Sequence, residues 1–189
     1  MMTRRTAIAV FAVLALLAVP VLAEDKKPMA AEFTAVFISM NAPGAMGSPV
    51  QIYIESWTTD DVASSLATTL QQKGQAGLVN ALPNTRVGTI RIGTADGYPI
   101  SVARQRTTAE GRVVLLASNR PFAGFGNTAA SVDYPFGFIQ LNLKADGTGE
   151  GTIIGAASIS FDDKKNLTIG SYTVQPGRLS DVKERKPKK

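Results

Sequence analysis

Arginine side chains offer the clearest chemistry in this sequence. Arg91, Arg104, Arg106 and Arg112 fall within three consecutive segments that are expected to be strands. Because Arg104 and Arg106 are two residues apart, their side chains are expected on the same face of one strand. If that face lined the mouth of a barrel, its guanidinium groups could hold a carboxylate or a phosphate. The alternative is a solvated strand face with cross-strand acidic partners such as Glu110.

A second candidate lies in the segment 121–132, whose one proline and two glycines predict a long loop. It carries Phe122 and Phe125 without an obvious strand to bury them, and binding residues concentrate on loops. With Arg104 and Arg106, these rings would bind a small amphipathic anion, since the rings contact its apolar part and a guanidinium contacts the acid group. The competing interpretation makes both phenylalanines a lid over one end of the core.

The sequence predicts no catalytic residue set. It contains no His, the commonest general base, and no Cys. Paired carboxylates could hydrolyse a glycoside without His. The candidates for such a pair are also explained by a strand face, a helix start or a turn; they are Glu55, Asp60, Asp61 and Asp133. The stretch 146–151 has fewer acidic side chains than a calcium loop needs and is interpreted as a hairpin turn. We therefore expect no cofactor and no bound metal.

Residues 1–23 have the pattern of a cleavable secretory signal. Arg4 and Arg5 precede an unbroken apolar run, 7–19, and a small-residue cleavage site comes before Glu24. The run has about 13 residues, fewer than the roughly 20 that span a bilayer as a helix. The pattern predicts export to the periplasm or the extracellular space, by the general or the twin-arginine route, with an uncleaved anchor as the alternative. Without Cys there is no lipid attachment site of the lipoprotein kind.

The formal net charge of +5 is concentrated at the two ends of the chain. The signal segment contributes +2, and residues 178–189 carry six Lys or Arg against two acids, a net +4. The body, 24–177, is therefore −1, which does not indicate a face that binds nucleic acid. We expect a single domain at 24–178, followed by a basic, disordered tail at 179–189.

Strand patterns dominate that domain, with one helix among them. Val62, Leu66 and Leu70 fall four residues apart and predict the apolar stripe of a helix at 60–72 that ends at Gly74. Strands are expected at 33–40, 50–58, 86–93, 99–107, 112–118, 136–144, 151–161 and 167–174. The prediction is a mainly β (α+β) fold of about eight strands with one helix inserted after the second strand. It is either an antiparallel barrel or a strongly curved sheet.

A resemblance to known proteins rests on several short stretches taken in order: 55–59, 86–91, 103–105, 118–121, 133–136, 149–151 and 176–179. In this order they resemble a group of uncharacterised secreted bacterial proteins. The resemblance covers nearly the whole chain after the signal segment. It implies a single exported domain in a bacterial envelope setting, and it assigns no activity, cofactor or site residue.

These observations leave three functions open. The leading one is an exported, non-enzymatic β domain that binds a small apolar or anionic ligand, and an apolar pocket with Arg at its rim would favour it. The second is an interaction or structural protein of the cell envelope, which a solid core and a large exposed apolar patch would favour. The third is a hydrolase that uses carboxylates alone, which needs two of them roughly 5–9 Å apart across a cleft.

Overall fold

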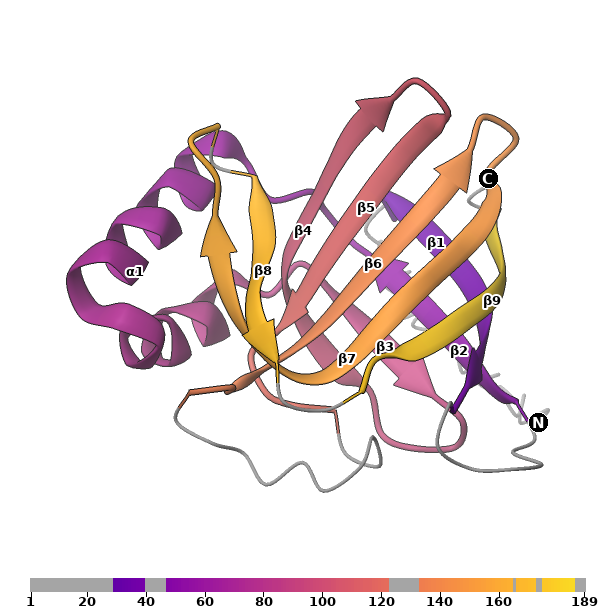
Figure 1. Ribbon diagram of the computed structural model, residues 1–189, viewed down its shortest axis with the longest axis horizontal. Coiled ribbons are helices and arrows are strands. Elements are labelled where there is room, and N and C mark those ends of the chain that lie inside the picture. The colour runs from indigo at the N-terminus through magenta and orange to yellow at the C-terminus, as the bar shows by residue number, and fades with distance from the viewer. Residues whose placement is uncertain (1–28, 40–46, 123–132, 165, 173–174, 186–189) are drawn as a thin grey trace, which may run out of the picture.

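The computed structural model describes residues 29–39, 47–122, 133–164, 166–172 and 175–185. Within them the chain forms nine strands, one helix and one 3-10 turn (Figure 1). In chain order the elements are β1 (Ala31–Ile38), β2 (Ser48–Ile54), α1 (Asp60–Ala81), η1 (Leu82–Thr85), β3 (Gly88–Ile92), β4 (Tyr98–Thr108), β5 (Gly111–Ser118), β6 (Phe136–Lys144), β7 (Thr148–Phe161), β8 (Leu167–Tyr172) and β9 (Gly177–Arg185).

Eight of these strands close into an antiparallel barrel. Their order around it is β1-β2-β3-β4-β5-β6-β7-β9, and β9 returns to pair with β1. The pairing of β6 with β7 joins what would otherwise be two separate sheet ends. β8 lies outside the ring and pairs with the C-terminal half of β7. The predicted antiparallel barrel with one helix after the second strand is confirmed.

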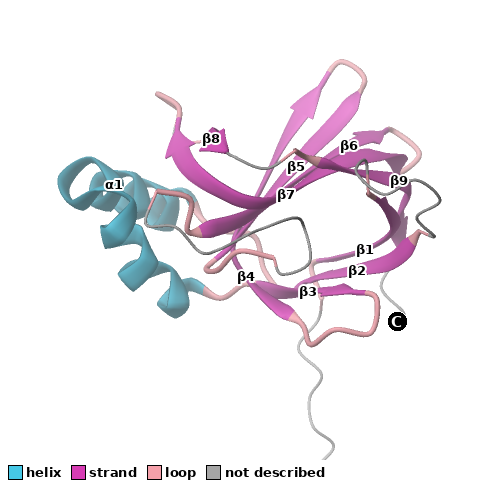
Figure 2. Cartoon of the chain, turned by 60° about the horizontal axis from the view of Figure 1, so that its bottom comes forward, coloured by secondary structure: helices cyan, strands magenta, loops and turns pink. Residues whose placement is uncertain are grey.

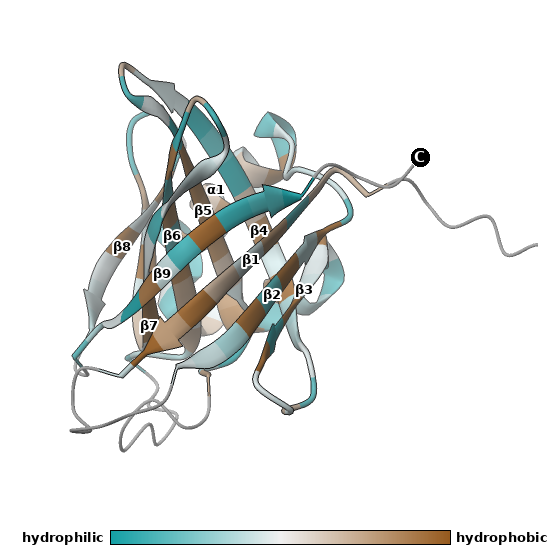
Figure 3. Ribbon diagram, turned by 90° about the vertical axis from the view of Figure 1, so that its right-hand side faces the viewer, coloured by the Kyte–Doolittle hydropathy of each residue, from teal (hydrophilic) through white to brown (hydrophobic). Residues whose placement is uncertain are grey.

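The interior of the barrel is filled by apolar side chains. Residues alternate between the two faces of each strand, so one set from every strand points inward. Figure 3 shows the resulting alternation of hydrophobic and hydrophilic bands along β2 and β9. Each barrel strand contributes at least one completely buried residue to this interior core: Phe33, Ile52, Ile90, Ile100, Leu116, Ile139, Ile153 and Leu179. The interior is therefore a packed core at these positions, unlike that of a ligand-holding cup.

A second apolar core lies outside the barrel, where α1 and β8 cover its wall (Figure 2). Strand β5 serves both cores. Val114 and Leu116 belong to the interior core, whereas Val113 and Leu115 belong to the outer one. This explains why the segment is apolar on both faces, a pattern that indicates a central strand.

Helix α1 supplies its predicted stripe to the outer core. Leu66 is buried there, and Val62 and Leu70 pack against the same cluster. The helical geometry breaks at Gly74, which has a φ of 63°, as the predicted helix end requires. A further helical stretch then continues the element and carries the fully buried Leu78. No helix in the described ranges is long and apolar enough to cross a membrane.

The prediction of a disordered tail at 179–189 is wrong for 179–185, which belong to β9; residues 186–189 lie outside the described ranges. Leu179 and Val182 both point into the interior core. They are three residues apart, and a bulge at Asp181, with a φ of 51°, keeps both on the inward face. The bulge interrupts the two-residue alternation of buried and exposed side chains that identifies a strand. The charged residues of β9 are therefore typical of a solvated tail when only the sequence is considered.

Candidate functional site

The predicted arginine cluster does not form. Arg104 and Arg106 share one face of β4, as expected. Ala103, the residue before Arg104, belongs to the interior core. Because successive residues of a strand point to opposite faces, Arg104 and Arg106 lie on the outer wall of the barrel and not at its mouth. Arg112 of β5 points to the interior, on the opposite face. Arg91 of β3 lies over the ring of Tyr53 of β2, with its guanidinium carbon 5.9 Å from the ring centre. The four side chains therefore do not share one site.

Arg104 holds the start of α1 against the barrel. Its Nη2 lies 2.7 Å from the Asp60 carboxylate, and its Nη1 donates to the Thr58 carbonyl at 2.9 Å. The Thr58 hydroxyl accepts the N–H of Ala103 at 2.9 Å, and the Thr58 N–H donates to the Ala103 carbonyl. The segment between β2 and α1 is thus pinned to β4. These contacts give Arg104 a structural role and leave little of its side chain exposed.

Arg112 closes one end of the barrel. Its guanidinium forms an ion pair with Glu184 of β9, and its Nη1 donates to the Gln105 side chain at 3.2 Å. The guanidinium carbon lies 5.8 Å from the centre of the Phe33 ring, within cation–π range. The acidic partner is therefore Glu184, not Glu110, and these side chains form a polar cover over the interior core.

Phe122 lies inside the barrel, at the other end of β5 from Arg112. It is completely buried, and its ring meets that of Tyr98 edge-to-face with centroids 5.1 Å apart. Gly137 of β6 leaves room for the ring, because a Cβ at that position would lie 2.6 Å from it. This placement corresponds to the core-lid interpretation and separates Phe122 from Arg104 and Arg106 outside. Phe125 lies outside the described residues.

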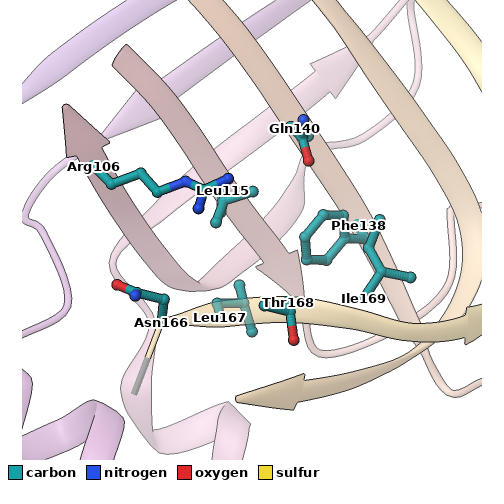
Figure 4. A pocket seen from close by; sticks show the side chains of 8 residues that line it. All are labelled: Arg106, Leu115, Phe138, Gln140, Asn166, Leu167, Thr168 and Ile169. Atoms are coloured by element: carbon teal, nitrogen blue, oxygen red, sulfur yellow. The ribbon is translucent and has the colours of Figure 1, made fainter. Parts of the chain in front are cut away.

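Arg106 lines a groove between β8 and the outer wall of the barrel, which we call the β8 groove. Figure 4 shows its side chain extending beside Leu115 on the wall, with β8 opposite. The groove encloses about 90 Å³. It is lined by Arg106, Leu115, Phe138, Gln140, Asn166, Leu167, Thr168 and Ile169. Its floor is apolar, since Leu115, Phe138 and Leu167 all belong to the outer core.

The charge at this groove comes from Arg106. The Arg106 side chain is exposed and forms no hydrogen bond or ion pair with the described residues. The nearby turn holds Asp162, which accepts hydrogen bonds from the Asn166 side chain at 2.9 Å and from the Asn166 N–H at 2.8 Å. These bonds lower the pKa of Asp162, so its carboxylate stays ionised and engaged within the turn. Arg106 is left as a cation at the rim of an apolar hollow.

Two larger hollows, of about 740 and 600 Å³, lie at the tips of the β4–β5 and β6–β7 hairpins. Both are open to solvent and contain charges of both signs, among them Glu110, Lys144 and the already paired Arg112. A mixed rim of this kind does not select an anion or a cation. The smaller β8 groove therefore makes the stronger candidate.

The stretch 146–151 forms the predicted hairpin turn. The Asp146 carboxylate accepts the Thr148 hydroxyl at 2.7 Å and the Thr148 N–H at 2.8 Å, and these bonds lower its pKa. The carboxylate is thus used in turning the chain between β6 and β7. Elsewhere in the described ranges, no three His, Cys, Asp or Glu side chains gather as metal ligands would.

The sequence does not predict most of the residues that line the β8 groove. The sequence indicates only Arg106 as a site residue, because Leu115, Phe138 and the residues of β8 are far apart along the chain. A usable signal was present in β6, whose outward positions change from the apolar Phe138 to the polar Gln140. That change marks where the cover over the barrel wall ends.

Comparisons with protein-family models, with curated proteins and with solved structures found no match to this chain. The assignment of the site therefore rests on the geometry of the chain itself.

Proposed function

We propose that this protein is an exported, non-enzymatic barrel that binds a small amphipathic carboxylate in the β8 groove. One observation supports it above the others: the Arg106 guanidinium has no partner in the described part of the chain and stands at the rim of a partly open groove with an apolar floor. Export is supported by the signal pattern of residues 1–23, which lie outside the described ranges.

The groove suits a ligand with two unlike ends. Leu115 and Phe138 offer apolar contact for a hydrocarbon group, and the Arg106 guanidinium can donate paired hydrogen bonds to a carboxylate. The groove volume of about 90 Å³ is smaller than the roughly 150 Å³ of a cavity that holds benzene. It accommodates a branched chain of a few carbons, whereas a long acyl chain would extend into solvent.

The alternative functions have less support in the structure. Within the described residues, the large apolar side chains that are exposed are Ile38, Val79 and Tyr172, which lie on three different elements and do not define a single patch. Two of the acids considered for hydrolysis are in ion pairs, since Glu55 contacts Arg86 at 3.5 Å and Asp60 contacts Arg104. The partnered acids favour the structural interpretation of these side chains.

The test uses 4-methylpentanoate as the probe, with 4-methylpentanamide and acetate as controls. The amide keeps the shape and lacks the charge, and acetate keeps the charge and lacks the branched chain. We expect the acid to bind with a dissociation constant of about 0.1–1 mM, given its small number of atoms. Titration by protein-observed NMR or calorimetry measures it, and neither control should bind at similar concentrations.

Two variants complete the test. Arg106→Gln removes the charge from the groove and should weaken binding of the acid at least tenfold, because hydrogen bonds to charged groups are worth about 1.5–3 kcal/mol. Arg91→Gln removes an exposed arginine on β3, away from the groove, and should bind like the unchanged protein. Binding of the acid and the amide with equal affinity, or loss of binding in both variants, contradicts the proposal.

A further inference from the structure

Among the described residues, strand β8 has an edge with no neighbouring strand. Each of the eight barrel strands has a neighbour on both sides over at least part of its length, whereas β8 pairs with β7 alone. An unpaired edge presents a row of N–H and C=O groups to which another extended chain can add. β8 lacks the two residue types that most directly block such addition, since 166–177 contains no charged residue and its strand carries no proline.

The identity of the exposed groups follows from the pairing. Ser160 is opposite Thr168, and the turn bond from the Asp162 N–H to the Asn166 carbonyl marks the next hydrogen-bonded pair. Hydrogen-bonded pairs alternate with non-bonded ones in an antiparallel ladder. Leu167 and Ile169 therefore direct their N–H and C=O groups away from β7, toward the unpaired edge.

The opposite edge of this hairpin is protected. The Gln75 side chain of α1 donates to the Ile159 carbonyl at 2.8 Å and accepts the Ile159 N–H at 3.3 Å. A glutamine amide thus takes the place of a neighbouring strand on β7. The β7 edge of the hairpin is therefore covered by a side chain of α1, whereas the β8 edge has no neighbouring strand in the described ranges.

The available edge faces the β8 groove. Four consecutive residues, 166–169, line the groove, although the side chains of a strand alternate between its two faces. A lining of consecutive residues indicates that the edge itself borders the hollow. Figure 4 shows the same arrangement, with Leu115 and Phe138 on the wall across from β8 and with Arg106 near the Asn166 end.

Building on the function proposed above, we propose that the β8 groove binds the C-terminus of an extended peptide, which adds to β8 as a short antiparallel strand. The antiparallel direction brings the terminal carboxylate to the Asn166 end, where Arg106 can bind it. The main chain of the peptide exchanges hydrogen bonds with Leu167 and Ile169. This is strand addition to a sheet edge combined with capture of a free carboxylate.

The pairing also sets which peptide side chains are recognised. Residues directly opposite one another in an antiparallel pair point to the same face. Leu167 packs in the outer core and Ile169 packs against it, so their partners in the peptide point at the barrel wall. These partners are alternate residues, the last and the third from the end. Both should be small or medium apolar side chains, because the hollow encloses only about 90 Å³.

The experiment measures binding of the labelled peptide Thr-Ser-Val-Thr-Val with a free carboxyl end, by fluorescence anisotropy. Three relatives are compared with it: the C-terminal amide, a version with aspartate third from the end, and a version N-methylated at the last and third-last residues. We expect each relative to bind at least tenfold more weakly. In Arg106→Gln the acid and amide peptides should bind equally, whereas Arg91→Gln should keep the difference.

The outcomes separate the peptide proposal from the simpler function. If 4-methylpentanoate binds and the peptide neither binds nor displaces it, the groove is a small-molecule site and the peptide proposal is overturned. Equal binding of the acid and amide peptides, or of the N-methylated peptide, overturns it as well, because recognition would not use the carboxylate or the strand edge. If neither the peptide nor 4-methylpentanoate binds, both proposals fail. Circular dichroism of each variant confirms that the barrel is folded.

Discussion

The contact between Phe122 and Gly137 allows a quantitative test of the barrel core. The Phe122 ring is completely buried, so Phe122→Ala should lower the free energy of unfolding by about 3–5 kcal/mol. Gly137→Ala also lowers stability, but it does so by adding volume to the core instead of removing it. A Cβ at Gly137 would lie 2.6–2.7 Å from three atoms of the ring, and the ring is completely buried against Tyr98. Overpacking of this kind costs about 1–3 kcal/mol.

The double variant distinguishes a shared space from two independent defects. Independent effects would add, giving a loss of about 4–8 kcal/mol. If the added methyl group clashes only with the ring, removing the ring removes the clash. The double variant should then be no less stable than Phe122→Ala alone, with a coupling energy of about 1–3 kcal/mol.

Urea unfolding followed by tryptophan fluorescence measures these energies. Trp57 is the single tryptophan of the chain and packs against the interior core, so its emission reports on the barrel. A double variant whose loss equals the sum of the two single losses would refute the reasoning. So would a Phe122→Ala variant within about 1 kcal/mol of the unchanged protein, because that result would place the ring outside the core.

Three other outcomes are expected. Deleting 177–189 should abolish cooperative thermal unfolding, because β9 joins β1 to β7, whereas deleting 186–189 alone should preserve it. Arg104→Met should cost about 1–2 kcal/mol in urea unfolding through the lost bonds to the α1 start, with Lys73→Ala, an exposed position on α1, changing stability by less than about 0.5 kcal/mol. Intact mass of protein from a bacterial envelope fraction should begin at Glu24, and a species that retains residue 1 would contradict the signal assignment.

Local patterns predicted much of the fold. The four-residue spacing of Val62, Leu66 and Leu70 gave the helix and its buried face, because packing followed the same period as the backbone. The apolar run in β5 indicated a strand covered on both sides, and the two cores supply both covers. Hairpin turns between neighbouring strands then favoured an antiparallel arrangement.

The remaining features depend on contacts between distant parts of the chain. β9 was missed because the bulge at Asp181 breaks its alternation and because its charges were counted without regard to the face they occupy. Of the residues that line the β8 groove, the sequence indicates only Arg106. The apolar floor of the groove combines β5, β6 and β8, and no spacing within one strand reveals that β8 folds over the outer wall.

The position of β9 also determines when the barrel can be completed. The Ser180 hydroxyl of β9 donates to the Val36 carbonyl of β1, 144 positions away in the sequence. The first strand therefore gains its second neighbour only when the last strand is present. A chain that becomes available N-terminus first can form its early hairpins. The inner faces of these hairpins stay exposed to water until β9 pairs with β1. Such long-range closure slows folding and lengthens the time in which apolar surface can aggregate. For a chain threaded through a membrane unfolded, the same topology delays folding until translocation is nearly over, and a holding chaperone would be needed in the interval.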